Sequence, residues 1–535
     1  MLYAEVAVDT YQDPARKLFT YSIPEDLRGL TREGVKVSVP FGKRVVEGFV
    51  WSTSNRKPPF PTKDIQAVKG PVFSKAKARF DAGRDLRSLT KSLRSFVKPS
   101  FSKTQIELAK WMAKRYLASP RDCLKCQIPG KGERVMIGNP KKVTTLLLLP
   151  YASQVSLSSL PTPGVDSYGT LVGSRSAVFA PLPNLKKIVI EEPENWNYKD
   201  ERAPYYHAAE VAQKRAEIEK LSLELRYQTP RVEDYKEISE RSARGAIGER
   251  SEITINGKAL ISPTSLPSLL SPPSPIIIDL NREKLAGNFT FVSQPMEAAL
   301  SSRKYSLVYV NSRELREGIK EELRKLGPDK NFYKVIGPEL FALPGQEAFH
   351  TIWADVDTLL NLPDFRAHEK IVWTVQKLNQ LTKGKLFLQT SSPENPLFKN
   401  LESGPLDVAQ GRPERSRMGG QLESFYRREL ENRKKFSLPP FATLVKLSYS
   451  AKSSTQVHLE AEGLYESILN LKSQTSNLEI SPPYEPYAKT PGKVQLNIAV
   501  KLKNKGAKQK EETLDKLSKT IPPDWKVEVD PESLL

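Results

Sequence analysis

The chain has 535 residues, 27% of them charged and 39% hydrophobic, and its 82 Lys and Arg residues outnumber 62 Asp and Glu residues. This length allows roughly three or four domains, and the composition is typical of a soluble protein with ample core. The apolar run at residues 146–149 is far shorter than the roughly 20 residues that span a bilayer. The N-terminus alternates apolar and polar residues, which predicts a first strand rather than a signal peptide, so we expect a cytoplasmic protein.

The positive charge is concentrated near the N-terminus. Residues 1–140 hold 27 basic and 13 acidic side chains, a difference of 14 out of the net charge of +20. A basic surface indicates a polyanion partner, most simply nucleic acid, although it can also serve solubility alone. Membrane binding would require an amphipathic anchor in addition, so we expect no membrane partner.

The first predicted elements are short strands followed by helices. Residues 1–72 alternate apolar and polar residues between Gly and Pro turns, which predicts a small β-rich domain. Residues 73–100 are basic at helical spacing and predict an exposed linker helix. Apolar residues from Ile106 to Tyr116 recur on one stripe and predict a packed helix over 104–116.

From residue 141 onward, predicted strands and helices alternate, which indicates parallel sheets with crossovers. The first such unit covers residues 141–262, with strands at 143–149 and 187–192 and a helix at 207–221. The second covers 263–420, with a helix at 314–325. Residues 421–535 follow and predict a compact α+β domain. The predicted strands of these last two units lie near residues 276–279, 307–311, 351–357, 385–389, 443–450, 495–502 and 525–530.

The strand predicted at 187–192 carries the clearest chemical signal. It ends in Glu191 and Glu192, and acids in this position hold Mg²⁺ and orient the attacking water in nucleotide-driven motors. Such a motor also needs a Gly-rich loop closing with Gly-Lys-Ser/Thr, and the 535 residues contain none. The sequence therefore predicts the body of a motor without its phosphate-binding loop.

Several long sequence segments resemble segments of one family, the PriA primosomal replication-restart helicases, and they occur in the same order along the chain. They are residues 18–50, 172–185, 191–217, 354–370, 384–396, 427–447 and 525–531. The resemblance implies an α/β multidomain protein. It implies a small β-rich domain (1–72) that captures a DNA 3′ end and a reduced winged-helix region within 73–140. It further implies two RecA-like helicase lobes with parallel sheets (141–262 and 263–420) and a C-terminal α+β domain (421–535).

The chain also departs from the family's pattern. Where the resemblance implies the P-loop, the zinc cysteines and the QVAGRAGR stretch, the chain has residues 129–132, 312–313 and 375–385 without those motifs. The DEEH motif has become Glu-Glu-Pro-Glu at 191–194. ATP hydrolysis needs a phosphate cradle, a metal-holding acid and cations for the transition state. We therefore expect that the ATP, Mg²⁺ and Zn²⁺ sites are lost and that the chain is not an enzyme.

Two clusters have competing interpretations. We assign no catalytic role to Glu191, Glu192 and Glu194, and favour a surface acidic pair over residual Mg²⁺ binding. Cys123 and Cys126, the two cysteines of the chain, exclude a disulfide framework. They could form half of a zinc site or a redox pair, but the histidines show no matching ligand spacing, so we favour packed thiols.

One candidate DNA-binding group lies in residues 196–206, which we call the aromatic loop. Its members are Trp196, Tyr198, Lys199, Arg202, Tyr205 and Tyr206. Aromatic faces interleaved with cations suit unstacked bases of a single strand. In the family this segment senses DNA, and the alternative is that these rings pack between the lobes.

The second group lies in the N-terminal domain. The resemblance implies a pocket for the terminal 3′ nucleotide made by a Phe-Asp pair and a lysine. Here Phe19 is retained as a stacking surface, the acid is Thr20, and the lysine position holds Gln66. Thr would replace the Asp acceptor weakly through its hydroxyl. Four cations could bind the DNA backbone or could be solvated loop charges. They are Lys43, Arg44, Arg56 and Lys57.

Together these features predict an ATPase-inactive adaptor that recognises branched or single-stranded DNA at stalled forks. The resemblance implies single-stranded-DNA-binding protein and primosome or helicase-loading proteins as partners. An active 3′–5′ DNA helicase, a scaffold that binds DNA only through charge, and a protein acting on RNA are the alternatives.

Overall fold

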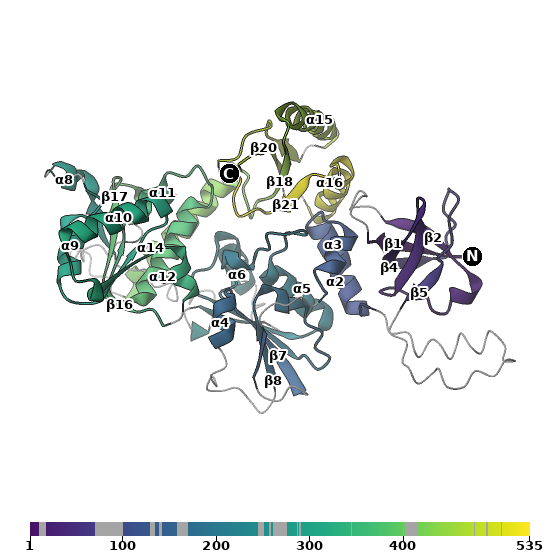
Figure 1. Ribbon diagram of the computed structural model, residues 1–535, viewed down its shortest axis with the longest axis horizontal. Helices are drawn as coiled ribbons and strands as arrows, with labels where there is room; N and C mark the ends of the chain where they lie inside the picture. Colours follow the sequence, from purple (N-terminus) through teal and green to yellow (C-terminus); the bar gives the residue numbers. More distant parts are fainter. Residues whose placement is uncertain are drawn as a thin grey trace.

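The computed structural model describes most of the chain, with gaps that include residues 70–99, so the linker helix predicted at 73–100 lies outside the described residues except for its last position. The described residues are 1–9, 18–69, 100–128, 134–137, 142–157, 169–243, 251–255, 258–259, 275–285, 287, 290–343, 345–399, 401, 415–475, 477–487, 491–503 and 506–535. Figure 1 shows a small N-terminal domain, two α/β lobes and a C-terminal domain. The predicted multidomain α/β architecture is confirmed.

The N-terminal domain is a five-stranded antiparallel sheet that curls into a barrel. Its strands, in spatial order, are β2 (Phe19–Ile23), β1 (Leu2–Val8), β4 (Arg44–Ser54), β3 (Lys36–Phe41) and β5 (Ala67–Lys69). The residues before β5 close the barrel, because Ser22 N donates to Lys63 O and Ile65 N donates to Ser22 O, both at 3.0 Å. Alternate residues such as Val6 and Val37 fill the interior and leave the intervening side chains on the outside.

Two helices connect the barrel to the first lobe. Helix α2 (Lys103–Arg115) confirms the helix predicted at 104–116, and α3 (Pro120–Lys125) follows it. Ser102 begins α2 with a capping box, in which its hydroxyl accepts from Gln105 N and the Gln105 side chain accepts from Ser102 N. Gly34 of the barrel has a φ of +82°, and a Cβ there would lie 2.3 Å from Phe101 O, so the close approach of barrel and helix requires glycine.

Lobe 1 is a seven-stranded sheet. Its spatial order is β12 (Lys258–Ala259), β11 (Ser251–Ile255), β10 (Ser222–Tyr227), β9 (Lys187–Glu191), β7 (Val143–Leu148), β8 (Gly169–Gly173) and β6 (Arg134–Ile137). The five inner strands are parallel, while both edge strands are antiparallel, so the prediction of a parallel sheet holds for the interior only. Its helices are α4 (Ala152–Leu157), α5 (Ala208–Glu219) and α6 (Val232–Ala243).

Lobe 2 is a fully parallel sheet, as predicted. Its spatial order is β13 (Ile276–Asp279), β17 (Thr382–Thr390), β16 (Ala348–Trp353), β14 (Ser306–Tyr309) and β15 (Tyr333–Ile336). The helix predicted at 314–325 is confirmed as α10 (Arg313–Leu326). The other helices of the lobe are α8 (Leu280–Leu285), α9 (Gln294–Ser301), α11 (Val356–Leu360), α12 (Ala367–Leu381) and α13 (Pro396–Lys399).

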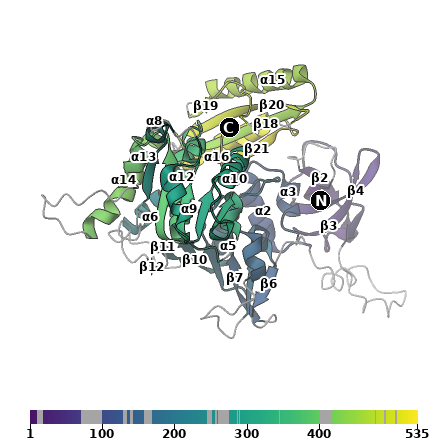
Figure 2. The same ribbon diagram turned by 60° about the vertical axis from the view of Figure 1, so that its left-hand side comes forward.

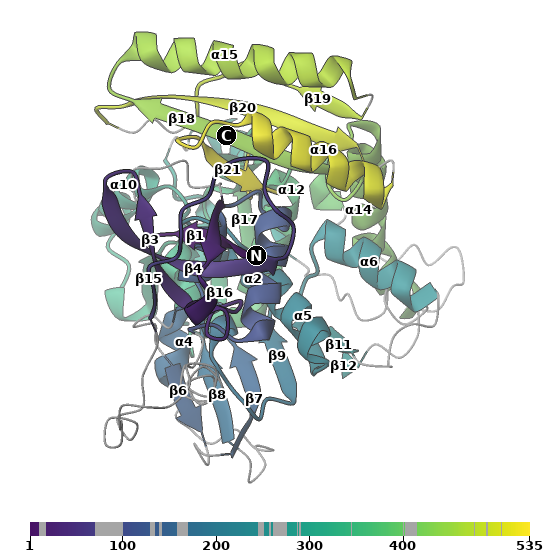
Figure 3. The same ribbon diagram turned by 90° about the vertical axis from the view of Figure 1, so that its right-hand side faces the viewer.

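The long helix α14 (Arg415–Lys435) leads from lobe 2 into the C-terminal domain. There an antiparallel sheet has the order β19 (Leu478–Ile480), β20 (Val494–Lys503), β18 (Ala442–Ala451) and β21 (Lys526–Val529). Helices α15 (Ser454–Ser473) and α16 (Ala507–Thr520) pack on this sheet and on each other. Figure 3 shows this domain lying across the top of the barrel and lobe 1.

The parts of the molecule are joined by apolar packing. One continuous cluster of buried residues includes Trp51 on the outer face of the barrel, Met112 of α2, Ile190 of lobe 1, Trp353 of lobe 2 and Leu447 of the C-terminal domain. Figures 1 and 2 place the barrel on the far side of α2 and α3 from the lobes. Across the described ranges, the helices are all too short or too polar to cross a membrane.

Candidate functional site

The first acid of the predicted motor motif lies at the end of β9, in the middle of the lobe 1 sheet. The neighbouring strand β10 places Arg226 in register with Glu191. Arg226 Nη1 donates to Glu191 Oε1 at 2.6 Å, and Arg226 Nε donates to Glu224 Oε1 at 2.6 Å. Burial raises the pKa of Glu191, and its bond to Arg226 opposes this rise. Glu191 is therefore half of an ion pair on the sheet.

The second acid, Glu192, leaves the strand and points into the contact between the lobes. Its φ of 50° turns the chain away from the sheet. Its carboxylate accepts from Lys377 Nζ of α12 in lobe 2, from Gln228 Nε2 at 3.2 Å and from Asn195 Nδ2 at 3.1 Å. The residue is only 7% exposed. Both carboxylate oxygens are thus engaged by protein donors.

The third acid, Glu194, is fully buried. Its Oε1 accepts from the backbone N–H groups of Gln228 and Thr229, both at 2.9 Å. Within the described part of the chain, its Oε2 has no hydrogen-bond partner. Burial raises the pKa of Glu194 to about 7, and the nearby charge of Glu192 adds to the rise. Burial therefore favours the protonated form of Glu194.

These surroundings decide what the three acids can do. A metal-holding acid needs oxygens that face the ion and remain free to bind it. Here Arg226 binds Glu191, Lys377 binds Glu192, and backbone N–H groups bind one of the two oxygens of Glu194. Among the residues that the structure describes, no group of three or more His, Cys, Asp or Glu residues could hold a metal ion. The prediction of Glu191 and Glu192 as a surface acidic pair is wrong for Glu192, which lies in the interior, while the Glu191 side chain is 31% exposed.

The start of the aromatic loop is packed between the lobes. The Trp196 ring lies with its centroid 4.5 Å from that of Trp373 on α12. Tyr198 is fully buried, and its hydroxyl lies 3.0 Å from Leu148 O and 2.8 Å from Glu191 O. These contacts attach the loop to the ends of β7 and β9 and to lobe 2.

In the rest of the loop, Lys199 and Tyr205 face the C-terminal domain, and Tyr206 packs on lobe 1. Lys199 Nζ donates to Val529 O at 2.8 Å, and Lys526 Nζ lies 4.7 Å from the centre of the Tyr205 ring. Tyr206 is buried, with its ring centroid 5.2 Å from that of Phe179.

The exposure of the loop residues bears on how they could meet DNA. The Arg202 side chain is 86% exposed and accessible to a polyanion. The rings of Tyr198 and Tyr206 are buried in this conformation, so base stacking by these two residues would require the loop to open. A DNA-binding role for the loop stays a prediction.

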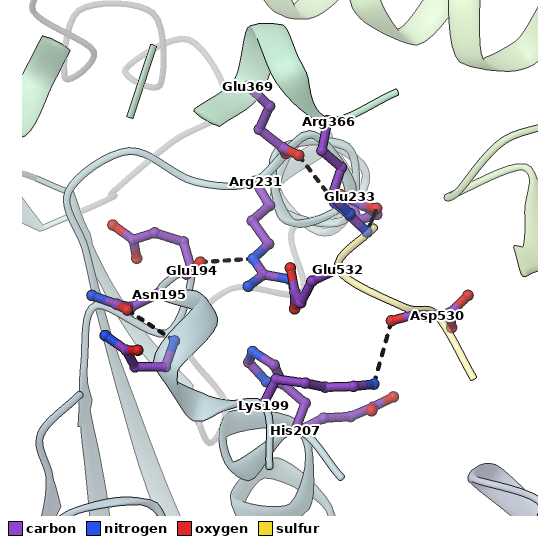
Figure 4. A network of polar contacts seen from close by, with 12 residues as sticks. Glu194, Asn195, Lys199, His207, Arg231, Glu233, Arg366, Glu369, Asp530 and Glu532 are labelled. Carbon is purple, nitrogen blue, oxygen red and sulfur yellow. Dashed lines mark hydrogen bonds and ion pairs between the residues drawn. The ribbon is translucent and has the colours of Figure 1, made fainter. Parts of the chain in front are cut away.

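A charged cleft of about 340 Å³ lies where lobe 1, lobe 2 and the end of the chain meet. Arg231 Nη1 donates to Glu532 Oε1 at 3.0 Å, and Arg231 Nε donates to Glu194 O at 2.7 Å. Burial alone would raise the pKa of Glu532, but Arg231 and Arg366 hold it at about 2. Figure 4 shows Glu532 beside Arg231, and the Asp530 backbone oxygen facing Lys199 from the opposite side.

The N-terminal barrel brings an aromatic pair and two cations to one end. The Phe19 and Phe41 rings meet edge to face, with centroids 5.1 Å apart. Phe41 is paired with Arg44 across the hairpin, and Lys43 lies in the turn between them. Lys43 and Arg44 are exposed. An aromatic surface beside exposed cations can hold a nucleotide through its base and its phosphates.

Other predicted residues of the barrel lie elsewhere. Thr20 follows Phe19 in β2, and successive strand residues point to opposite faces, so Thr20 lies on the outer face opposite Glu5. Gln66 is exposed, and its N–H donates to Ser38 O at 3.0 Å. The exposed Arg56 and Lys57 follow the end of β4, as solvent-accessible charges. Their binding roles stay predictions.

The cysteines are packed within α3 and just after it. Cys123 is fully buried, and Cys126 Sγ donates to Cys123 O at 3.3 Å. Burial raises the pKa of both thiols, which disfavours the reactive thiolate. The geometry supports the interpretation as packed thiols.

Several residues of this site were not predicted. Arg226, Lys377 and Trp373 contact the acids and the aromatic loop, yet no sequence motif marks them. The helix that carries the last two could have been found, because Ile371, Val375 and Leu378 recur at helical spacing. Their partners on lobe 1 are more than 170 positions away in the sequence, and no local pattern indicates such a pairing.

Comparisons with known proteins relate parts of the chain to PriA proteins. The family model described as the PriA 3′DNA-binding domain (3′BD) matches residues 5–81. The chain is 23% identical over 402 residues to replication restart protein PriA of Chlamydia muridarum, covering 58% of this chain and 51% of that protein. It is 30% identical over 148 residues to PriA of Bacillus subtilis, covering 27% and 16%. For PriA of Synechocystis sp. the identity is 27% over 205 residues, covering 34% and 23%. These matches span about half the length of the relatives or less.

Proposed function

The chain belongs to the PriA family, and from this premise we propose that it is a DNA-binding protein of replication restart that does not hydrolyse ATP. In this proposal the chain recognises forked or single-stranded DNA in the cytoplasm and acts as an adaptor. The barrel supplies the DNA contact. The two lobes supply a scaffold in place of a motor.

One observation carries the proposal that ATP is not hydrolysed. At the end of β9, Arg226 binds Glu191, Lys377 binds Glu192 and backbone N–H groups bind Glu194, so each acid already has a protein donor. The sequence also lacks the Gly-Lys-Ser/Thr loop that would hold the phosphates. Losing a single transition-state cation can lower the rate of phosphoryl transfer by about 10³-fold or more. With phosphate loop and metal acids both lost, no useful turnover is expected.

The barrel supports the DNA-binding part of the proposal. It lies within the match to the PriA 3′DNA-binding domain, and Phe19, Lys43 and Arg44 gather at one of its ends. Thr20 and Gln66 replace the acid and the lysine expected there, so we propose that 3′-end recognition is weaker than backbone binding. The PriA relationship also suggests single-stranded-DNA-binding protein and helicase-loading proteins as partners.

Equilibrium binding to three DNA substrates tests this role. The substrates are a fork with a leading-strand 3′-OH at the junction, the same fork with a 3′-phosphate, and a plain duplex, in about 0.15 M salt. Tighter binding to the 3′-OH fork would support a fork-marking adaptor. Equal binding to all three would leave only charge-driven DNA binding, the second candidate function, which the net charge of +20 favours.

A phosphate-release assay with Mg²⁺, ATP and forked DNA tests the proposal that the chain does not hydrolyse ATP. We expect no DNA-stimulated release above the level of a sample without protein. DNA-stimulated hydrolysis that is lost on Glu192→Gln would overturn the proposal and restore the interpretation as an active helicase.

A further inference from the structure

The contact between the two lobes is filled by side chains at the place where a motor would bind its nucleotide. Glu192 of lobe 1 pairs with Lys377 of lobe 2, and their side chains are 9% and 12% exposed. Next to this pair, Trp196 packs on Trp373 with ring centroids 4.5 Å apart. Glu192 in the acidic motif and Trp196 next to it thus bind residues of lobe 2.

A second set of contacts lies deeper, at the start of α6. Arg366 of lobe 2 binds Glu233 of lobe 1 through two hydrogen bonds, of 2.7 and 3.2 Å. Glu369 accepts from Val232 N, the first residue of α6, at 2.7 Å. The Arg366 side chain is only 4% exposed. Figure 4 shows Arg366 between Glu233 and Glu369.

Helix α14 adds a third set of contacts. The Arg433 side chain, 1% exposed, lies 3.1 Å from Glu233 of lobe 1 and 3.1 Å from Glu369 of lobe 2. Tyr426 stacks on Tyr235 of lobe 1 with ring centroids 4.1 Å apart, and its hydroxyl donates to a lobe 1 carbonyl at 2.6 Å. The helix that leads into the C-terminal domain is therefore bound to both lobes.

Separating the lobes would break these contacts together. Glu192 and Lys377 would lose each other, and Arg366 would lose Glu233, in a region of low dielectric constant where unpaired charges are strongly unfavourable. A ligand can open such a junction only through its difference in affinity for the open and closed states. The acids and cations that a nucleotide would use to generate that difference are already bound to each other.

We propose that Glu192, Lys377, Glu233, Arg366, Glu369 and Arg433 form an interlobe clamp that keeps the lobes and α14 as one rigid body. The former motor cleft has become a permanent contact. The clamp fixes the orientation of lobe 2 relative to lobe 1. This inference goes beyond the proposed function and does not depend on DNA binding.

Distance measurements between spin labels test the clamp in the full-length chain. Glu217→Cys on α5 and Arg324→Cys on α10 place labels on exposed sites of the two lobes, with Cys123 and Cys126 replaced by Ala. We expect a single narrow distance distribution that is unchanged by Mg²⁺ and ATP or by forked DNA. A broad distribution, or a shift on adding Mg²⁺ and ATP, would overturn the proposal.

Variants of Lys377 test whether its contact with Glu192 keeps the distance between the lobes constant. Lys377→Met should broaden the distribution, while Lys377→Arg, which keeps the charge, should retain it. Lys383→Met is the matched control, because Lys383 pairs with Glu347 on the surface of lobe 2 with both side chains more than half exposed. Identical distributions for Lys377→Met and Lys383→Met would refute the clamp. Loss of DNA binding without a distance change would instead count against the proposed function alone.

Discussion

The barrel and the interlobe clamp use the same kinds of charged residues in opposite ways. At the tip of the β3–β4 hairpin, Lys43 and Arg44 are exposed beside an aromatic pair. In the clamp, Arg366 and Arg433 are almost fully buried and bound to carboxylates. A charge that faces solvent is available to a ligand, whereas a buried charge must already have its partner. The comparison therefore separates a binding surface from a structural core, although both are rich in basic residues.

The largest expected effect comes from removing a buried cation of the clamp. Arg433→Met leaves Glu233, Glu369 and Glu429 without their shared partner, and should lower the free energy of unfolding by about 3 to 5 kcal/mol. Chemical denaturation would measure this. Arg427→Met on the same helix is the matched control, because its pair with Glu423 has the same spacing but Arg427 is 70% exposed. The control should cost less than about 1 kcal/mol. Equal losses would contradict the buried network.

The next effect concerns a buried acid that lacks a cation. The pKa of Glu194 rises from 4.5 to about 7 on folding, so the folded chain holds a proton that the unfolded chain loses between these values. This contribution to stability is complete below pH 4.5 and is lost as the pH rises through about 7. At about 1.4 kcal/mol per pKa unit, it amounts to at most about 3.5 kcal/mol. Glu194→Gln should therefore be more stable than the parent chain at about pH 8 and equal to it near pH 4.

Glu369→Gln is the contrasting variant. Burial alone would raise the pKa of Glu369, but Arg433 and Arg366 hold it at about 2. Glutamine would leave these cations without a charged acceptor, so Glu369→Gln should destabilise the chain across neutral pH. Denaturation at a series of pH values distinguishes the two variants. Parallel pH profiles would show that the environments of Glu194 and Glu369 do not differ as the structure indicates.

The overall fold was more predictable from the sequence than the site was. Strand and helix periodicity is local, so β7, α5 and α10 were found within a few residues of their observed ends. The antiparallel edge strands of lobe 1 were missed because pairing direction depends on contacts distant in the sequence. For the same reason, the sequence could indicate that Glu191 and Glu192 end a strand but could not show that Arg226 and Lys377 neutralise them.

At the barrel, the expected effect is on DNA rather than on stability. Removing both exposed cations with Lys43→Ala and Arg44→Ala should make the slope of log affinity against log salt shallower by about 1.4 to 1.8, as for two lost phosphate contacts. Fluorescence anisotropy with single-stranded and forked DNA would measure it. The control replaces Arg282 and Arg324, two exposed cations of lobe 2, by Ala. An unchanged slope in the barrel variant would remove the hairpin from the DNA-binding surface.

The smallest expected effect concerns the aromatic loop. Its cations are intermediate between the exposed cations of the barrel and the bound cations of the clamp. Arg202 is 86% exposed, so Arg202→Ala should change the salt slope by about 0.7 if it contacts one phosphate, and should leave stability nearly unaltered. Lys199 is its neighbour in the loop, but its ammonium group donates to Val529 O and Asp530 O. Lys199→Met should therefore lower stability and leave the slope unchanged. If both variants changed only stability, the loop would belong with the clamp, because neither of its cations would be available to DNA.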